Sequence, residues 1–119
     1  MAFLVNAPKQ NATTDVLQVE VVDSTGTSTA IASSVVTSVN ASATSVVLLA
    51  SNASRKGATF YNDSAAILYL AFAATASAAA YTVQMVANAY FELPWPVYTG
   101  VISGIWVSAT GAVKITELS

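Results

Sequence analysis

The chain has 119 residues, of which 55% are hydrophobic and only 8% are charged, and its net charge is −2. It contains neither cysteine nor histidine, which excludes disulfides, thiolate metal sites, the Ser-His-Asp arrangement and the common zinc sites. Ordinary globular domains are about 25% charged, so we expect much of this surface to lie against copies of the chain or a larger assembly.

The N-terminal residues suggest an extended arm followed by a strand. Residues 1–14 include Pro8 and show no sustained period, which is typical of an arm that lies on a neighbour or of a frayed terminus. The first nine residues lack the basic leading region of a secretory signal. Residues 15–23 then alternate with a period of two and predict a strand with one dry face, and a turn is expected at 24–28.

The middle of the chain predicts four strands. Residues 34–39 and 44–50 carry clusters of Val and Thr, whose β-branched side chains favour strands over helix. Residues 58–63 and 67–72 are separated by the tight turn 64–66, so we expect these two strands to form a hairpin.

The C-terminal half predicts four more strands. Residues 73–80 form a loop of small side chains, and Pro94–Gly100 predicts a rigid corner, because proline fixes φ and removes a donor. A final pair of strands is expected around the turn 109–111. The four predicted strands are 81–86, 90–93, 101–108 and 112–118.

Eight or nine short strands spaced near ten residues predict an all-β fold, an antiparallel β-sandwich or jelly roll. We expect this single domain to cover residues 15–119, with residues 1–14 as its extended arm. The uncharged interval 64–91 is long enough to span a bilayer. Its weakly apolar middle, together with Gln84 and Asn88, favours strands over a membrane helix.

The adjacent cations Arg55 and Lys56 have two interpretations. They could bind a carboxylate on a partner subunit, with Gly57 giving the backbone room to turn, or they could be charged residues that guard an apolar strand.

The aromatic residues in and around the corner resemble the content of sugar-binding or subunit-contact surfaces, although a sandwich core would also contain them. They are Tyr90, Phe91, Trp95, Tyr98 and Trp106. We therefore name five candidate subunit or partner contacts, which are Arg55, Lys56, Trp95, Tyr98 and Trp106.

The acidic residues indicate a metal site or a catalytic carboxylate pair only weakly. Asp15, Glu20 and Asp23 are close in sequence, as in a calcium site, but on a strand Glu20 faces away from the other two. Glu92 and Glu117 could approach as the paired carboxylates of a glycosidase, although their spacing does not require it. Because no nucleophile has a visible activating base, we predict that the chain is not an enzyme and has no catalytic residue, cofactor or metal site.

An ordered series of short motifs resembles one known family. The run from Asn40 to Ser64, NASATSVVLLASNASRKGATFYNDS, is similar to small virion-associated proteins of tailed bacteriophages and prophages. Further similar motifs extend the resemblance to about residue 118. These are Leu68-Tyr-Leu, Ala74-Thr-Ala-Ser77, Tyr81-Thr-Val, Tyr90-Phe-Glu-Leu-Pro94, Tyr98-Thr-Gly, Gly104-Ile-Trp106, Ala109-Thr-Gly111 and Val113-Lys-Ile-Thr-Glu-Leu118.

The resemblance implies a component of the virus particle. Among such roles, a capsid cement or decoration protein suits this size and composition best, and such proteins are often β-rich and trimeric. We therefore expect a homo-oligomer, a trimer, on the capsid surface of the virion, with the major capsid protein as partner and no contact with nucleic acid or membrane. The alternatives are a tail, collar or fibre-base protein, and a virion module that binds host glycans through Trp95, Tyr98 and Trp106.

Overall fold

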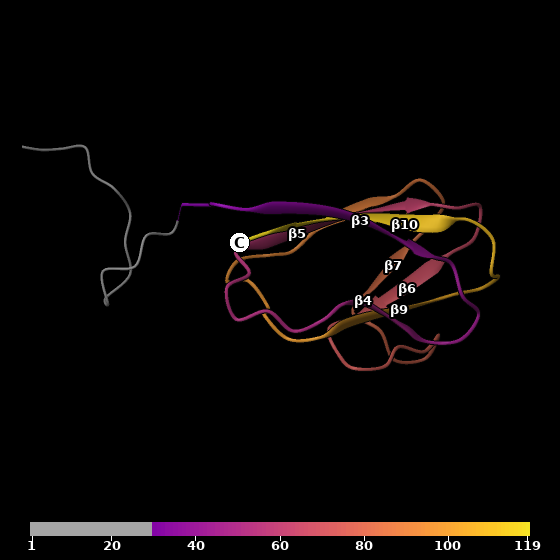
Figure 1. The fold of residues 1–119 in the computed structure, drawn as a ribbon. Coiled ribbons are helices and arrows are strands. Elements are labelled where there is room, and N and C mark those ends of the chain that lie inside the picture. Colours follow the sequence, from indigo (N-terminus) through magenta and orange to yellow (C-terminus); the bar gives the residue numbers. More distant parts are fainter. Residues whose placement is uncertain (1–29) are drawn as a thin grey trace, which may run out of the picture. The chain divides into compact units, whose positions relative to one another are not determined.

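The computed structural model describes residues 30–119 (Figure 1). The predicted arm at 1–14, the strand at 15–23 and the turn at 24–28 lie outside these residues. Residues 31–119 form a compact unit.

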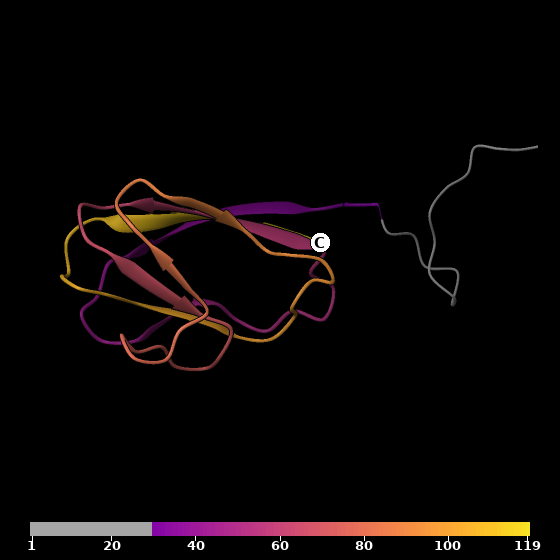
Figure 2. The ribbon, with the colours of Figure 1, turned by 180° about the vertical axis from the view of Figure 1, so that it is seen from behind.

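The described residues form eight strands in two antiparallel four-stranded sheets. Figures 1 and 2 show the sheets as two layers of a β-sandwich, which confirms the predicted fold class. In spatial order, the first sheet contains β3 (Ser34–Asn40), β10 (Ala112–Leu118), β5 (Gly57–Asp63) and β8 (Tyr90–Glu92). The second sheet contains β4 (Val46–Leu49), β9 (Ile102–Trp106), β6 (Leu68–Ala71) and β7 (Val83–Met85).

The core lies between the two sheets and follows from the alternation of side chains along each strand. In β5 and β10 the inward positions include Phe60, Val113 and Ile115, and in β6 they are Leu68 and Leu70. All five side chains are fully buried or nearly so. Burial of each large apolar side chain contributes about 1.5–3 kcal/mol, so this layer is the main source of the sandwich's stability.

The predicted hairpin of residues 58–63 and 67–72 is wrong. The strands exist, but β5 pairs with β10 and β8, whereas β6 pairs with β9 and β7 in the other sheet. The turn 64–66 therefore crosses from one sheet to the other. Phe60 of β5 and Leu68 of β6 bury their side chains in the core from opposite sides.

The final two strands differ from the prediction in the same way, since β9 and β10 lie in different sheets. Gly111, in the connection between them, has a φ of 93°, which glycine adopts without strain. A Cβ at Gly111 would lie 2.5 Å from the Ser64 Cβ and 2.7 Å from the Asp63 carbonyl oxygen. The two crossing connections therefore pack against each other at one end of the sandwich.

The interval 64–91 contains β6, β7 and the first residues of β8. Among residues 30–119 there is no helix long and apolar enough to cross a membrane.

Candidate functional site

Charged side chains are segregated in the sandwich. Every charged side chain of residues 30–119 belongs to the first sheet or to the two residues that directly precede β5. The second sheet and the loops that join its strands carry no charged side chain. We call the outer side of the first sheet the charged face. The six charged residues are Arg55, Lys56, Asp63, Glu92, Lys114 and Glu117. Of these, Asp63, Glu92 and Lys114 lie on the charged face, whereas the side chains of Arg55 and Glu117 point inward.

The outer side of the second sheet is apolar as well as uncharged. Tyr69 of β6 lies between Ile105 of β9 and Gln84 of β7, so these three side chains share the outer side. Val107 and Val86 continue the same alternation beyond the ends of β9 and β7, and they are 62% and 55% exposed. We call this surface the charge-free face. Its apolar side chains are Val47, Tyr69, Tyr81, Val86, Ile105 and Val107.

One end of the charge-free face is covered by the loop of small residues at 73–80. The Ser103 hydroxyl donates to the Ala73 carbonyl at 2.8 Å, and the Ala76 N–H donates to the Ser45 hydroxyl at 2.9 Å. These bonds hold the loop over β9, where Ser103 is fully buried. Val47, which is 53% exposed, lies opposite Ser103 on the edge strand β4. The loop therefore covers only part of this apolar surface and leaves the valines exposed.

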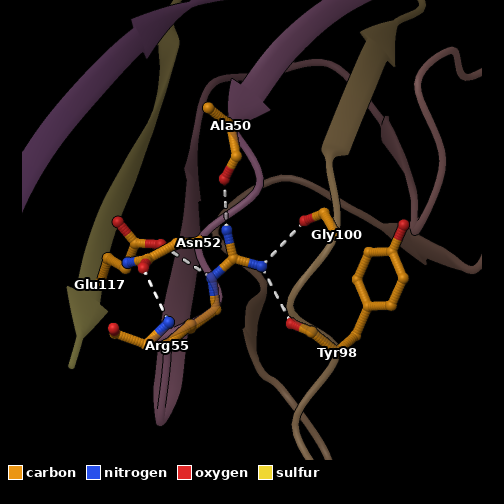
Figure 3. A network of polar contacts seen from close by, with 7 residues as sticks. Ala50, Asn52, Arg55, Tyr98, Gly100 and Glu117 are labelled. Carbon is orange, nitrogen blue, oxygen red and sulfur yellow. Dashed lines mark hydrogen bonds and ion pairs between the residues drawn. The ribbon is translucent and has the colours of Figure 1, made fainter.

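The Arg55 side chain lies inside the fold and is held by its own chain (Figure 3). Its Nε donates to Glu117 Oε2 at 2.7 Å, and one terminal nitrogen donates to the carbonyls of Tyr98 and Gly100, each at 2.9 Å. The other terminal nitrogen donates to the Ala50 carbonyl at 2.6 Å. The side chain has an exposed fraction of 0%, so in this conformation it offers no free surface to a partner's carboxylate.

A short turn before β5 places Arg55 in this position. The Asn52 side-chain oxygen accepts a hydrogen bond from the Ser54 N–H at 3.0 Å, which is the Asx turn that asparagine commonly makes. The Asn52 carbonyl accepts from the Arg55 N–H, and the Asn52 N–H donates to the Thr99 carbonyl. Lys56 follows the turn with a partly exposed side chain, and its role as a partner contact stays a prediction.

The structure separates the three aromatic residues that were predicted as contacts. Trp95 is 79% exposed and stands between Pro94 and Pro96. Tyr98 is partly buried and stacks on Phe72, with ring centroids 5.0 Å apart and an interplanar angle of 5°. These residues therefore do not form one exposed aromatic platform.

Trp106 is only 2% exposed, and its Nε1 donates to the Asn62 side-chain oxygen at 3.2 Å. Trp106 is therefore a core residue in this conformation and is not accessible to a partner. Of the aromatic candidates, Trp95 offers the largest exposed ring, and its partner role stays a prediction.

Asn62 is a structural residue that sequence reasoning missed. It is fully buried, and its amide nitrogen donates to the carbonyls of Ala66, Met85 and Val86 at 2.8–3.0 Å. Its oxygen accepts from Ser64 and Trp106. The available signal was its position, because the alternation of β5 places residue 62 on the same side as Phe60.

The two glutamates considered as a glycosidase pair lie on opposite sides of the first sheet. Glu117 is opposite the buried Ala58, whereas Glu92 is opposite Thr59 on the outer side. The Tyr90 hydroxyl donates to Glu92 at 3.3 Å. Local desolvation, and then the neighbouring Glu92 carboxylate, raise the pKa of Tyr90 above its ordinary value, so this phenol is neutral at pH 7.

The remaining acidic candidates, Asp15, Glu20 and Asp23, lie outside the described residues. Within the part that the structure describes, no group of three or more acidic, histidine or cysteine side chains could hold a metal ion. The chain matches no protein-family model, and searches of the curated proteins and of the solved structures found no significantly similar protein.

Proposed function

We propose that the chain is a structural protein of a bacteriophage particle, a non-enzymatic capsid cement or decoration protein. In this role it stabilises the coat-protein lattice at the capsid surface as a homo-oligomer, with a trimer as the expected state. The observation that carries the proposal is the charge-free face, which combines exposed valines with a complete lack of charged side chains. The resemblance of residues 40–118 to virion-associated proteins supplies the kind of assembly.

The charge-free face has the properties of a surface that is buried in an assembly. Interface cores are depleted of charged residues, and obligate interfaces are more apolar than the rest of a protein surface. Val47, Val86 and Val107 are each more than half exposed, and covering the three would contribute roughly 3 kcal/mol in total. Repeated over many subunits of a lattice, a contribution of this size stabilises the whole particle.

The copy number of the protein in purified particles tests the proposal. A cement protein covers the lattice, so its copy number should be of the same order as that of the major coat protein. Quantitative mass spectrometry of purified virions, with the coat protein as internal standard, gives this ratio. A number that fits a single ring would assign the chain to the tail, collar or fibre base, and complete absence from the particle would contradict a virion role.

A second candidate function, host-glycan binding, is favoured by the exposed ring of Trp95. A planar aromatic face held between two prolines is suited to stacking on a sugar ring. If this function is correct, immobilised host glycans should bind the wild-type protein, and Trp95→Ala should remove the binding. The matched control is Tyr81→Ala, which removes an aromatic ring, 42% exposed, from the charge-free face. Failure of the wild-type protein to bind any glycan would contradict this candidate.

A further inference from the structure

The four sheet edges of the described sandwich differ in length. The edge strands β4, β7 and β8 have four, three and three residues, whereas β3 has seven. Short edge strands are one way in which proteins avoid pairing with other chains. The β3 edge of the first sheet is therefore long, whereas the other three edges of the two sheets are short.

The hydrogen-bond alternation shows which backbone groups face outward from this edge. Ser33 and Ser119 exchange both bonds, from the Ser33 N–H at 2.7 Å and from the Ser119 N–H at 2.9 Å. Hydrogen-bonded pairs alternate along an antiparallel ladder, so the odd-numbered residues of β3 bond to β10. The N–H and C=O groups of the even-numbered residues point away from the sheet. These residues are Ser34, Val36, Ser38 and Asn40.

Within the residues that the structure describes, β3 lacks three features that usually prevent strand pairing. β3 has the sequence SVVTSVN, which contains no charge and no proline, and its register with β10 is continuous without a bulge. Val35 and Val36 are 51% and 73% exposed. A strand added here would cover one valine on each side of the sheet and would satisfy the outward backbone groups.

We propose that β3 pairs with β3 of a second copy of this chain, antiparallel, about a two-fold axis that passes beside Thr37. Among the described edges only another β3 matches this one in length. In this register Ser34 pairs with Asn40 of the second copy and Val36 pairs with Ser38. The even-numbered residues would then exchange about eight hydrogen bonds. A typical specific interface carries about ten.

The charges near the edge are compatible with this pairing. Lys114 lies opposite Ser38 and is the charged residue nearest the middle of β3. In the paired sheet the two Lys114 side chains would be separated by three strand spacings and two residues along the strand, which is about 16 Å. This distance exceeds the Debye length of about 8 Å at physiological salt, so their repulsion is screened. A charged partner strand would find no complementary charge on β3 itself.

A cysteine at position 37 provides a direct test, because the chain has no cysteine of its own. Thr37 would face its own counterpart in a non-hydrogen-bonded pair, where the Cα atoms are about 4.5 Å apart, within the range that a disulfide requires. Thr37→Cys in the purified full-length chain should form a disulfide-linked dimer under mild oxidation. The matched control, Val47→Cys, places an exposed cysteine on the edge strand of the other sheet.

A second variant tests the contact without a covalent bond. Val36→Lys adds a charge to the free edge at a position that is 73% exposed, so the sandwich should keep its unfolding midpoint. Sedimentation over a concentration series should show self-association in the wild-type protein and at least a tenfold weaker association in Val36→Lys. The pairing is overturned if Thr37→Cys cross-links no faster than Val47→Cys, or if Val36→Lys associates as strongly as wild type.

The proposal is independent of the virion role, because it uses only contacts of the isolated protein. A two-fold contact cannot lie within a three-fold ring, so in a trimeric assembly the β3 edges would join subunits of different trimers. Failure of the cross-link would leave the copy-number result intact, and the converse also holds.

Discussion

At the scale of single residues, Arg55 shows why a buried cation can stabilise the sandwich. Its guanidinium donates to one carboxylate and three carbonyl oxygens that come from three parts of the chain. An ammonium has a different shape and only three donors, so lysine could not satisfy the same four acceptors. Arg55 therefore ties the corner at 98–100 and the end of β10 to the turn before β5.

Replacement of Arg55 by methionine should destabilise the fold strongly. Arg55→Met keeps most of the side-chain volume but leaves Glu117, whose side chain is only 18% exposed, without its cation. Breaking a buried ion pair by removal of one partner costs about 3–5 kcal/mol, which should be measured as a lower free energy of unfolding in urea.

Lys114→Ala is the matched control for Arg55→Met. The Lys114 ammonium lies 4.0 Å from Asp63, and both side chains are more than half exposed. Exposed pairs contribute about 0–1 kcal/mol, so the loss should be small. Equal losses in Arg55→Met and Lys114→Ala would show that burial of the guanidinium contributes nothing to stability.

At the scale of elements, the eight strands between residues 34 and 118 could be predicted from the sequence. Period-two alternation and β-branched residues indicate strands wherever one face is dry, and turn residues separate them. β3 was predicted at 34–39 and observed at Ser34–Asn40, and β10 was predicted at 112–118 and observed there. These signals are local, because the alternation within each strand indicates which of its side chains face the core.

The pairing of strands could not be predicted in the same way, since it depends on contacts between distant residues. Local reasoning favours a hairpin wherever a short turn separates two strands. In this chain the buried Asn62 amide donates to carbonyls in the turn before β6 and at the end of β7, and its oxygen accepts from Trp106. These contacts join β5 to the opposite sheet, and they link residues up to 44 positions apart.

The candidate site shows the same limit. The exposed ring of Trp95 agrees with a short sequence between two prolines, whose rigid corner was expected. The burial of Arg55 was not predicted, because its carboxylate partner Glu117 lies 62 residues away. Its other acceptors include the backbone carbonyls of Tyr98 and Gly100, which residue types do not identify. The sequence around Arg55 does not show whether its side chain faces solvent or other parts of the same chain.

At the scale of the whole molecule, the few charged side chains are distributed unevenly between the two sides of the sandwich. Composition alone predicts that some surface is covered, but it does not say which side. The structure places all charged side chains of residues 30–119 in the first sheet or in the two residues directly before β5, so one side of the sandwich can remain solvated while the other is buried. A sandwich with one solvated and one apolar side is suited to lie flat on a lattice.

Two lysine substitutions, at positions of nearly equal exposure, test which side of the sandwich is covered. Val107, 62% exposed, lies on the charge-free face, and Tyr90, 61% exposed, lies on the charged face beside Glu92. In the proposed cement role, Val107→Lys should reduce incorporation into particles at least tenfold. An ammonium without a partner in a buried interface costs several kcal/mol, and about 1.4 kcal/mol already gives a factor of ten.

Tyr90→Lys should be incorporated within about twofold of the wild-type level, since its ammonium stays in water and lies near an acid. Both variants should unfold at the wild-type urea concentration, because each replaces an exposed side chain. Incorporation is measured as the ratio of variant to major coat protein in purified particles. If Tyr90→Lys is excluded and Val107→Lys is retained, then the charged face, and not the charge-free face, is the one that meets the lattice.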